Sequence, residues 1–149
     1  MNQGRIIVIT GSPGTGKTTT ASIVAKESNM DKSVHMHTDD FFHYLSKGAI
    51  PPHLPESNEQ NLVVIEAFLE AAKRYARGGY DVIVDGIVGP WFLEPWKALA
   101  QEDYEVHYIV LRASMEIRLR SKLKSVLILQ YLKILCIIGI EVKLDAKNL

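Results

Sequence analysis

Hydrophobic positions in the first part of the chain follow two kinds of pattern. A continuous apolar run over residues 6–9 predicts a buried strand, and residues 33–38 predict a second, shorter strand. Between them, residues 18–27 predict a helix, because apolar positions recur there at helical spacing. The apolar side of this helix consists of Ala21, Val24 and Ala25. A loop rich in proline and glycine, residues 48–55, follows the second strand.

The middle of the chain predicts a long helix over residues 59–77. Ser57 or Asn58 is expected to cap its start, and the Gly78-Gly79 pair ends it. The apolar positions expected to face the core are Leu62, Ile65, Leu69, Ala72 and Ala76.

Two further strands are predicted over residues 80–85 and 104–111, with a short helix over residues 93–101 between them. The fourth strand has Val106, Tyr108 and Val110 on one face and His107, Ile109 and Leu111 on the other. Alternating strands and helices predict an α/β protein with a parallel sheet. A length of 149 residues fits a single domain.

The last segment has a different character. Residues 126–140 are almost entirely apolar, but they are fewer than the about 20 that a membrane span requires. They are expected to form a buried helix, or a helix followed by a strand over residues 134–138. Residues 141–149 are polar and are expected to be weakly ordered.

A complete phosphate-binding pattern, G-x-x-x-x-G-K-[ST], joins the first strand to the first helix. Its residues are Gly11, Ser12, Pro13, Gly14, Thr15, Gly16, Lys17 and Thr18, with Thr19 next in the helix. Such a loop surrounds phosphate oxygens with backbone N–H groups, to which the helix N-terminus adds its positive end. Lys17 then reaches the β- and γ-phosphates, and the Thr18 hydroxyl contacts Mg²⁺. The pattern predicts binding of a nucleoside triphosphate.

Charge and cysteine content argue against some classes of protein. Seventeen basic and 17 acidic residues give no net charge, which argues against a nucleic-acid binder. Cys136 is the single cysteine, so an internal disulfide is excluded, and the start of the chain lacks the pattern of a secretory signal. These features predict a cytoplasmic protein that is not held in a membrane.

Acidic residues follow two of the predicted strands, at the sheet edge where α/β proteins bind ligands. Asp39 and Asp40 come after the second strand, and we favour Asp39 as a base for an acceptor hydroxyl or as a magnesium ligand through water. Asp85 ends the third strand after an apolar run, an arrangement of the Walker-B type, which bonds the loop Thr and a magnesium-bound water. Each of these acids could instead be an ordinary turn residue.

Basic and aromatic residues supply further candidates. Arg112, Arg118 and Arg120 follow the fourth strand and could clamp phosphates, although Arg118 and Arg120 cannot share one helix face. The aromatic residues of 41–42 and 89–92 could line an acceptor pocket or belong to the core. The five histidines show no clear metal pattern, although His35 and His37 share one face of a strand.

Together these motifs resemble the small P-loop kinases. The residues that carry the resemblance are the phosphate loop, Thr38-Asp39-Asp40, Val84-Asp85-Gly86 and Leu111-Arg112-Ala113-Ser114. The chloramphenicol phosphotransferase, shikimate kinase and gluconate kinase group is the most similar, with polynucleotide kinases and zeta-type toxins as relatives. The resemblance covers roughly residues 4–120.

The resemblance implies a three-layer P-loop NTPase fold with a parallel sheet in the order 2-3-1-4-5, and transfer of the ATP γ-phosphate to a small hydroxyl-bearing acceptor with Mg²⁺. It makes Asp39 the base and Arg118 or Arg120 the arginine of the lid. Residues 122–149 depart from the family, because their shift to Leu, Ile and Lys looks truncated or out of frame. We therefore expect an atypical C-terminal segment with an incomplete lid and adenine loop, and impaired catalysis.

Two other functions remain open at this stage. One is a non-catalytic ATP-binding protein or regulator; a GTPase is not favoured, because the guanine-recognition motif N/T-K-x-D is missing. The other is a polynucleotide 5′-hydroxyl kinase, which the neutral charge disfavours. The sequence does not identify the acceptor or the oligomeric state.

Overall fold

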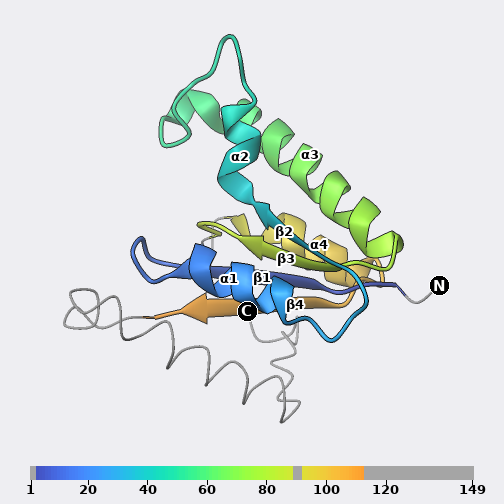
Figure 1. The fold of residues 1–149 in the computed structure, drawn as a ribbon. Coiled ribbons are helices and arrows are strands. Elements are labelled where there is room, and N and C mark those ends of the chain that lie inside the picture. Colours follow the sequence, from blue (N-terminus) through green and yellow to red (C-terminus); the bar gives the residue numbers. More distant parts are fainter. Residues whose placement is uncertain (1–2, 89–91, 113–149) are drawn as a thin grey trace.

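A parallel sheet of four strands forms the centre of the protein, as seen in a computed structural model that describes residues 3–88 and 92–112. The strands are β1 (Ile6–Gly11), β2 (Ser33–His37), β3 (Asp81–Asp85) and β4 (Val106–Leu111). Their order in the sheet is β2-β3-β1-β4 (Figure 1). This confirms the predicted α/β class and the order of its first four strands. The expected fifth strand falls outside the described residues.

Helices cover both faces of the sheet. They are α1 (Lys17–Lys26), α2 (Thr38–His43), α3 (Asn58–Arg77) and α4 (Glu94–Gln101), with a short 3₁₀ turn η1 (Pro55–Ser57) before α3. Residues of α1 pack on one face of the sheet, and residues of α3 and α4 pack on the other. In Figure 1, α2 and the loop after it rise away from the sheet beside the first half of α3. The result is the expected three-layer arrangement.

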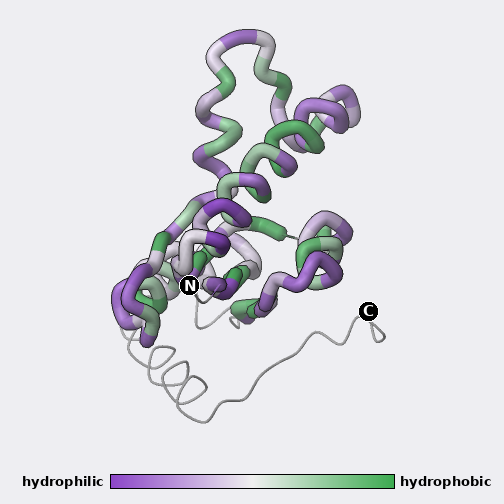
Figure 2. The backbone as a smooth tube through the Cα atoms, turned by 90° about the vertical axis from the view of Figure 1, so that its right-hand side faces the viewer, coloured by the Kyte–Doolittle hydropathy of each residue, from purple (hydrophilic) through white to green (hydrophobic). Residues whose placement is uncertain are grey.

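The central strands are apolar on both sides because both of their faces are covered. Ile6, Val8 and Val84 belong to the core under α3 and α4, whereas Ile7 and Ile9 belong to the core under α1. In Figure 2 the helices carry both hydrophobic and hydrophilic stretches, as expected for elements with one face against a core. Continuous apolar runs in the sequence therefore predicted β1 and β3 correctly.

Helix α3 uses a slightly different face from the predicted one. Ile65, Leu69, Ala72 and Ala76 are buried as expected, but Leu62 is 52% exposed. Val64 and Phe68 are buried in addition. The prediction for Leu62 was wrong because the first turn of α3 lies beside the loop after α2, where Asn61 faces inward instead.

Two local predictions also need correction. Residues 38–43 form the short helix α2, which the sequence pattern did not indicate because six residues are too few to show helical periodicity. Ser57 precedes α3, but its hydroxyl does not cap the helix; it donates to the carbonyl oxygens of Pro52 and Leu54. The ends of the other helices and strands agree with prediction to within two residues.

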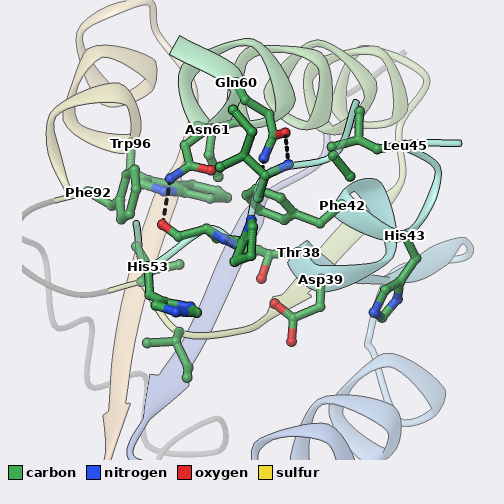
Figure 3. Close-up of a pocket in the computed structure, with 17 residues that line it drawn as sticks. Thr38, Asp39, Phe42, His43, Leu45, His53, Gln60, Asn61, Phe92 and Trp96 are labelled. Atoms are coloured by element: carbon green, nitrogen blue, oxygen red, sulfur yellow. Dashed lines mark hydrogen bonds between the residues drawn. The ribbon is translucent and has the colours of Figure 1, made fainter. Parts of the chain in front are cut away.

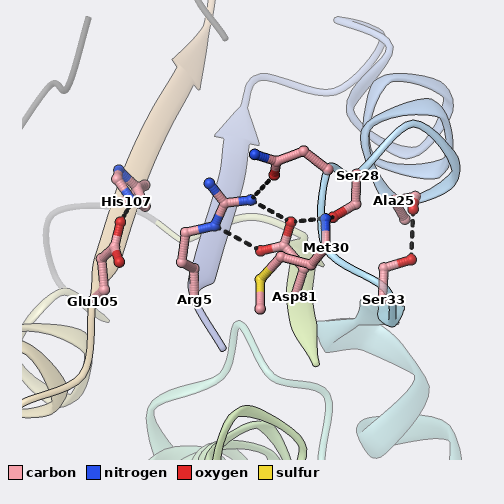
Figure 4. Close-up of polar contacts among 9 residues, drawn as sticks. Arg5, Ala25, Ser28, Met30, Ser33, Asp81, Glu105 and His107 are labelled. Atoms are coloured by element: carbon pink, nitrogen blue, oxygen red, sulfur yellow. Dashed lines mark hydrogen bonds and ion pairs between the residues drawn. The ribbon is translucent and has the colours of Figure 1, made fainter. Parts of the chain in front are cut away.

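At the amino-terminal edge of the sheet, a polar network joins β1, β3 and the end of α1 (Figure 4). Asp81 is 1% exposed, and Arg5 donates to both of its carboxylate oxygens at 3.1 and 2.7 Å. The Ser28 hydroxyl donates to the same carboxylate at 2.6 Å. This network lies at the opposite edge from the ends of β2 and β3 that carry the predicted site.

The segment 122–149, its apolar part 126–140, and Arg118 and Arg120 lie outside the described residues. The predictions of a truncated end, an incomplete lid and a buried C-terminal helix therefore stay predictions. Within residues 3–88 and 92–112, none of the helices combines the length and apolar character needed to cross a bilayer. The cytoplasmic location also stays a prediction.

Candidate nucleotide and acceptor site

The phosphate loop has the backbone form that its glycines allow. Gly14 and Gly16 have φ angles of 78° and 82°, in the left-handed region where a Cβ would be strained. Thr15 closes the loop, because both its backbone N–H and its hydroxyl donate to the Ser12 carbonyl, at 3.3 and 2.8 Å. The bent form of the loop is thus stabilised by hydrogen bonds within the loop itself.

Helix α1 begins directly after this loop, at Lys17. No side chain caps its N-terminus, and its first turn contains no acidic residue. The N–H groups of the first turn, which lack partners inside a helix, are therefore available to an anion at the positive end of the helix dipole. The Lys17 ammonium donates to the Ser12 carbonyl at 3.2 Å, so it lies over the loop.

The loop also packs against the end of β4. A Cβ added to Gly11 would lie 2.4 Å from the Leu111 carbonyl oxygen, so no larger residue fits without displacing the strand. Arg112, which follows Leu111, is exposed. Gly11 therefore brings the start of the segment after β4 close to the phosphate loop.

Asp39 and Asp40 occupy the first turn of α2 and are both exposed. Only Asp39 is among the residues that line the adjacent pocket. The two neighbouring carboxylates thus differ in position: Asp39, the residue favoured from the sequence, lines the pocket, and Asp40 does not. Sequence reasoning missed the helix that produces this separation.

Asp85 ends β3 and is 2% exposed. In the sheet it is paired with Ile9 of β1 and with His37 of β2. Since Ile9 is two residues before the start of the phosphate loop at Gly11, Asp85 lies near that loop. Its Oδ1 is 2.6 Å from His37 Nδ1 and 3.5 Å from His35 Nε2. The expected hydrogen bond from the Thr18 hydroxyl is not formed. The close contact with His37 does not have hydrogen-bond geometry, and within the described residues neither Asp85 oxygen has another hydrogen-bond partner.

The ends of β2 and β3 touch through Gly86 and Thr38. A Cβ on Gly86 would lie 1.9 Å from the Thr38 hydroxyl oxygen and 2.9 Å from the Thr38 Cβ. Only glycine fits there, so α2 can start directly above the turn after β3. This contact brings Asp39 and Asp85 to the same edge of the sheet.

A pocket of about 690 Å³ opens beside Asp39 (Figure 3). Its walls come from α2, the loop at residues 49–53, α3, the segment after β3 and α4. They are largely apolar, with Phe42, Phe92 and Trp96 among them. None of the described residues that line it is a lysine or an arginine. The candidate aromatics thus divide: Phe42 and Phe92 line the pocket, and Phe41 packs on Phe68 in the core.

Hydrogen bonds to α3 fix the loop that forms one wall of the pocket. The Gln60 amide both donates to the Ile50 carbonyl, at 2.7 Å, and accepts from the Ile50 N–H, at 2.8 Å. The Asn61 amide donates to the Pro52 carbonyl at 2.8 Å. The sequence signal for this wall was only its proline content; the two amides on α3 that hold it were missed.

A second set of contacts connects the pocket to the phosphate loop. The Val88 N–H donates to the hydroxyl of Thr10, the residue before the loop, at 2.9 Å. The Tyr108 hydroxyl donates to the Val88 carbonyl at 2.6 Å, and burial raises the pKa of Tyr108 above its ordinary value of 10.0. Since Val88 lines the pocket, the acceptor space and the nucleotide loop are joined by direct bonds.

Comparison with known proteins agrees with this geometry. A family model described as an AAA domain matches residues 7–123. The adenylate kinase of Helicobacter pylori (strain Shi470) is 29% identical over 120 residues, which is 76% of this chain and 60% of that enzyme. The chain therefore spans less than two thirds of the length of this relative.

Solved structures share the fold at low identity. The Mycobacterium tuberculosis APS kinase CysC, in complex with AMPPNP and APS, has a TM-score of 0.58 and 19% identity, over 85% of this chain and 73% of that chain. A chain of the Pnkp1/Rnl/Hen1 RNA repair complex has a TM-score of 0.58 and 21% identity, over 89% and 46%. These similarities establish the P-loop kinase fold and leave the acceptor open.

Proposed function

The chain belongs to the AAA-domain family, and we propose that it is an ATP-dependent phosphotransferase that moves the γ-phosphate of ATP to a hydroxyl group of a small molecule. The observation that carries the proposal is the position of Asp39. Its carboxylate lines an apolar pocket that is bonded, through Val88 and Thr10, to the phosphate loop. The pocket that Asp39 lines is therefore joined to the strand that leads into the phosphate loop.

The phosphate loop is proposed to hold ATP. Its backbone N–H groups and the uncapped start of α1 face the β- and γ-phosphates, and Lys17 neutralises their charge. Magnesium fits the same edge of the sheet, because Thr18 offers a hydroxyl and Asp85 a buried carboxylate without hydrogen bonds among the described residues. When bound, the ion neutralises charge on the phosphate oxygens.

Asp39 is proposed to accept the proton of the acceptor hydroxyl. It is exposed to the pocket, so it can approach a bound hydroxyl within hydrogen-bond distance. Arg118 and Arg120 are proposed to stabilise the transferring phosphoryl group, as the resemblance to small P-loop kinases implies. Asp40, on the adjacent position of α2, has no such role.

The chemistry of the pocket favours a hydroxyl acceptor with an uncharged, partly apolar body. An acceptor that is itself a phosphate or sulfate ester is normally held by arginine or lysine. Among the described lining residues the only titratable side chains are Asp39, His43 and His53. A carboxylate at the mouth disfavours an anionic acceptor further, and apolar walls favour a ring or an aliphatic chain.

Asp39→Asn and Asp40→Asn form a matched pair for testing this function. Hydroxylated metabolites and antibiotics are screened for acceptor-dependent ADP production from ATP and Mg²⁺. With an active acceptor, Asp39→Asn is expected to lower kcat by about 100-fold or more, whereas Asp40→Asn stays close to wild type. Both variants should bind ATP–Mg²⁺ as the wild type does, measured by calorimetry. Equal turnover in Asp39→Asn would remove this residue from the base role.

Two other functions are separated by the same screen. Tight ATP binding without stimulation by any acceptor would favour a non-catalytic ATP-binding protein or regulator. The similarity to a chain of an RNA repair complex makes a polynucleotide 5′-hydroxyl kinase the second candidate. Transfer of labelled phosphate from ATP to a 5′-hydroxyl oligonucleotide, in preference to small acceptors, would support that function.

A further inference from the structure

The proposed phosphoryl transfer gives no role to the two histidines that lie beside Asp85, in a group of three side chains at the ends of β2 and β3. The group consists of His35, His37 and Asp85. One ligand atom from each lies within 4.8 Å of the others. The two imidazole rings are 4.5 Å apart, and both face the Asp85 carboxylate, at 2.6 Å for His37 and 3.5 Å for His35.

The cross-strand register explains why these residues meet. His35 and His37 are two positions apart on β2, so they share one face of the sheet. The register pairs His37 with Asp85, and the intervening Met36 faces the opposite core. The sequence showed that the histidines share a face, but not that a buried carboxylate stands beside them.

The burial of this group is costly without a cation. Asp85 is almost fully buried, and among the described residues neither of its oxygens accepts a hydrogen bond. The Nε2 atom of His35 is also buried without a hydrogen-bond partner there. A buried carboxylate without hydrogen bonds normally costs several kcal/mol, unless a positive charge offsets it. The His37 ring offers such a charge only in its protonated form, whereas a bound cation offers it with both imidazoles neutral. The group therefore has the composition and burial of a ligand set.

We propose that His35, His37 and Asp85 bind a divalent transition-metal ion such as Zn²⁺. Two imidazole nitrogens and a carboxylate oxygen are ligands that Zn²⁺ prefers, whereas Mg²⁺ and Ca²⁺ prefer oxygen alone. Three protein ligands leave a fourth position for water or for an external group.

The geometry needs only a small adjustment to fit such an ion. Bonds of about 2.0–2.2 Å in a tetrahedral site place ligand atoms about 3.3 Å apart. The 3.5 Å between His35 Nε2 and Asp85 Oδ1 is close to this spacing, and the 2.6 Å between His37 Nδ1 and Asp85 Oδ1 must lengthen by less than about 1 Å. The two imidazole nitrogens lie within 4.8 Å of each other, so they need to approach by no more than about 1.5 Å. His37 is the most exposed of the three, with 36% of its side chain accessible, so it has room to move and gives the ion access.

The transition-metal ion is expected to compete with Mg²⁺ for the Asp85 carboxylate. This second part rests on the proposed function, which assigns the Asp85 carboxylate to the magnesium of ATP–Mg²⁺. A transition ion that occupies the carboxylate withdraws it from that role, so a metal-loaded protein binds ATP–Mg²⁺ more weakly.

Co²⁺ is a suitable probe because its visible absorption reports the ligands and the geometry. The full chain, freed of metal with a chelator and without nucleotide, is titrated with Co²⁺ and then with Zn²⁺. One equivalent of Co²⁺ is expected to bind and to be displaced by Zn²⁺. His35→Gln and His37→Gln are each expected to weaken binding by more than about 10-fold.

His107→Gln is the matched control. This histidine also lies on a strand beside a carboxylate, 2.8 Å from Glu105, but it has no third ligand among the described residues (Figure 4). It should bind Co²⁺ as the wild type does. Loss of binding equal to that in His37→Gln, or a wild type without a stoichiometric site, overturns the proposal.

Two further measurements keep the proposal decidable. X-ray absorption of the Zn²⁺-loaded wild type should show two imidazole ligands, and a spectrum without imidazole overturns the site even if a variant fails to fold. Calorimetry of ATP–Mg²⁺ with the Zn²⁺-loaded protein tests the second part. Unchanged affinity overturns the competition with magnesium but leaves the Co²⁺ result, while absence of ATP–Mg²⁺ binding by the metal-free protein overturns the proposed function instead.

Discussion

The Tyr108 hydroxyl shows how one atom holds the two halves of the candidate site together. It donates to the Val88 carbonyl, which among the described residues otherwise accepts only a long bond of 3.4 Å from the Thr10 hydroxyl. The phenol is partly buried and is in its neutral form when it donates this bond. Burial therefore raises its pKa, because ionisation would place a charge in a poorly hydrated position.

Tyr108→Phe is expected to lower the free energy of unfolding by about 0.5–1.5 kcal/mol near neutral pH, the usual contribution of one hydrogen bond. The raised pKa also predicts a pH dependence. The folded state holds this proton more tightly than the unfolded state, so the stability is fully present below the ordinary pKa of 10.0 and is lost as the pH rises above it. Denaturant unfolding at several pH values should show a smaller alkaline loss in the variant.

Tyr75→Phe provides the comparison, because Tyr75 on α3 is 41% exposed. Its alkaline loss of stability should match that of the wild type. An alkaline slope that is the same in all three proteins would contradict the assignment to Tyr108.

Single residues of the site differ in how far the sequence could define them. Lys17 and the loop glycines were predicted because the pattern fixes the local backbone, and the structure confirms that backbone. The choice between Asp39 and Asp40 depends on the direction of a short helix, and the group of His35, His37 and Asp85 depends on register between strands. Neither is encoded by local spacing, so both required the structure.

At the scale of elements, hydrogen bonds from side chains of α3 fix the backbone of the loop after α2. The Gln60 side-chain amide accepts a hydrogen bond from the Ile50 N–H and donates one to the Ile50 carbonyl. It thus satisfies both backbone groups of Ile50, as a paired strand would. The wall of the pocket is therefore defined by side chains of α3 rather than by the sequence of the loop itself.

Gln60→Ala is expected to remove both of these bonds and to lower the free energy of unfolding by about 1–3 kcal/mol. Amide hydrogen exchange should increase at residues 48–55, and KM for the acceptor should rise while the affinity for ATP–Mg²⁺ stays unchanged. Glu59→Ala, an exposed change at the preceding position, is the control: it removes a charge from the first turn of α3, so it should lower the free energy of unfolding by less than about 1 kcal/mol and alter neither exchange nor KM. Equal protection of the loop in both variants would contradict the role of Gln60.

Elements were predictable where periodicity is long or continuous. The apolar runs of β1 and β3 and the 20 residues of α3 gave strong patterns, and all three were predicted. Helix α2, with six residues, and the exposure of Leu62 were missed. Both depend on how the loop after α2 packs on α3, which is a tertiary effect that local patterns do not contain.

At the scale of the whole molecule, a partly buried ion pair that stabilises the fold and the residues of the candidate site lie at opposite ends of the strands. The pair of Arg5 and Asp81 closes the amino-terminal edge, where β1, β3 and the end of α1 meet. The phosphate loop, Asp39 and Asp85 lie at the carboxyl edge, as expected for open α/β sheets. A change at the first edge should therefore alter stability without altering the site.

Asp81→Asn is expected to lower the free energy of unfolding by about 2–4 kcal/mol. This is somewhat less than for a fully buried pair, because 26% of the Arg5 side chain is still exposed. Denaturant unfolding measures the loss, and calorimetry should find the affinity of the folded protein for ATP–Mg²⁺ unchanged. Glu70→Gln, which removes a surface partner of Lys73, is the control and should change stability by less than about 1 kcal/mol. A large loss of nucleotide affinity in Asp81→Asn would show that the two edges are coupled.

The architecture as a whole was the most predictable level, because the alternating pattern indicated the α/β class and the resemblance to small P-loop kinases implied the strand order. The α/β class and the order of four strands are confirmed. The pocket was the least predictable, since its walls come from five segments far apart in the sequence. The aromatic residues hinted at it, but their division between core and pocket follows only from packing.

Anchoring of the pocket wall through main-chain atoms has a consequence for engineering. Gln60 and Asn61 grip the backbone of Ile50 and Pro52, so most side chains of that wall are not needed to keep it in place. A combinatorial library that randomises Ala49, Ile50 and His53 should therefore yield many folded proteins. Such a library would reshape the choice of substrate while the scaffold stays intact.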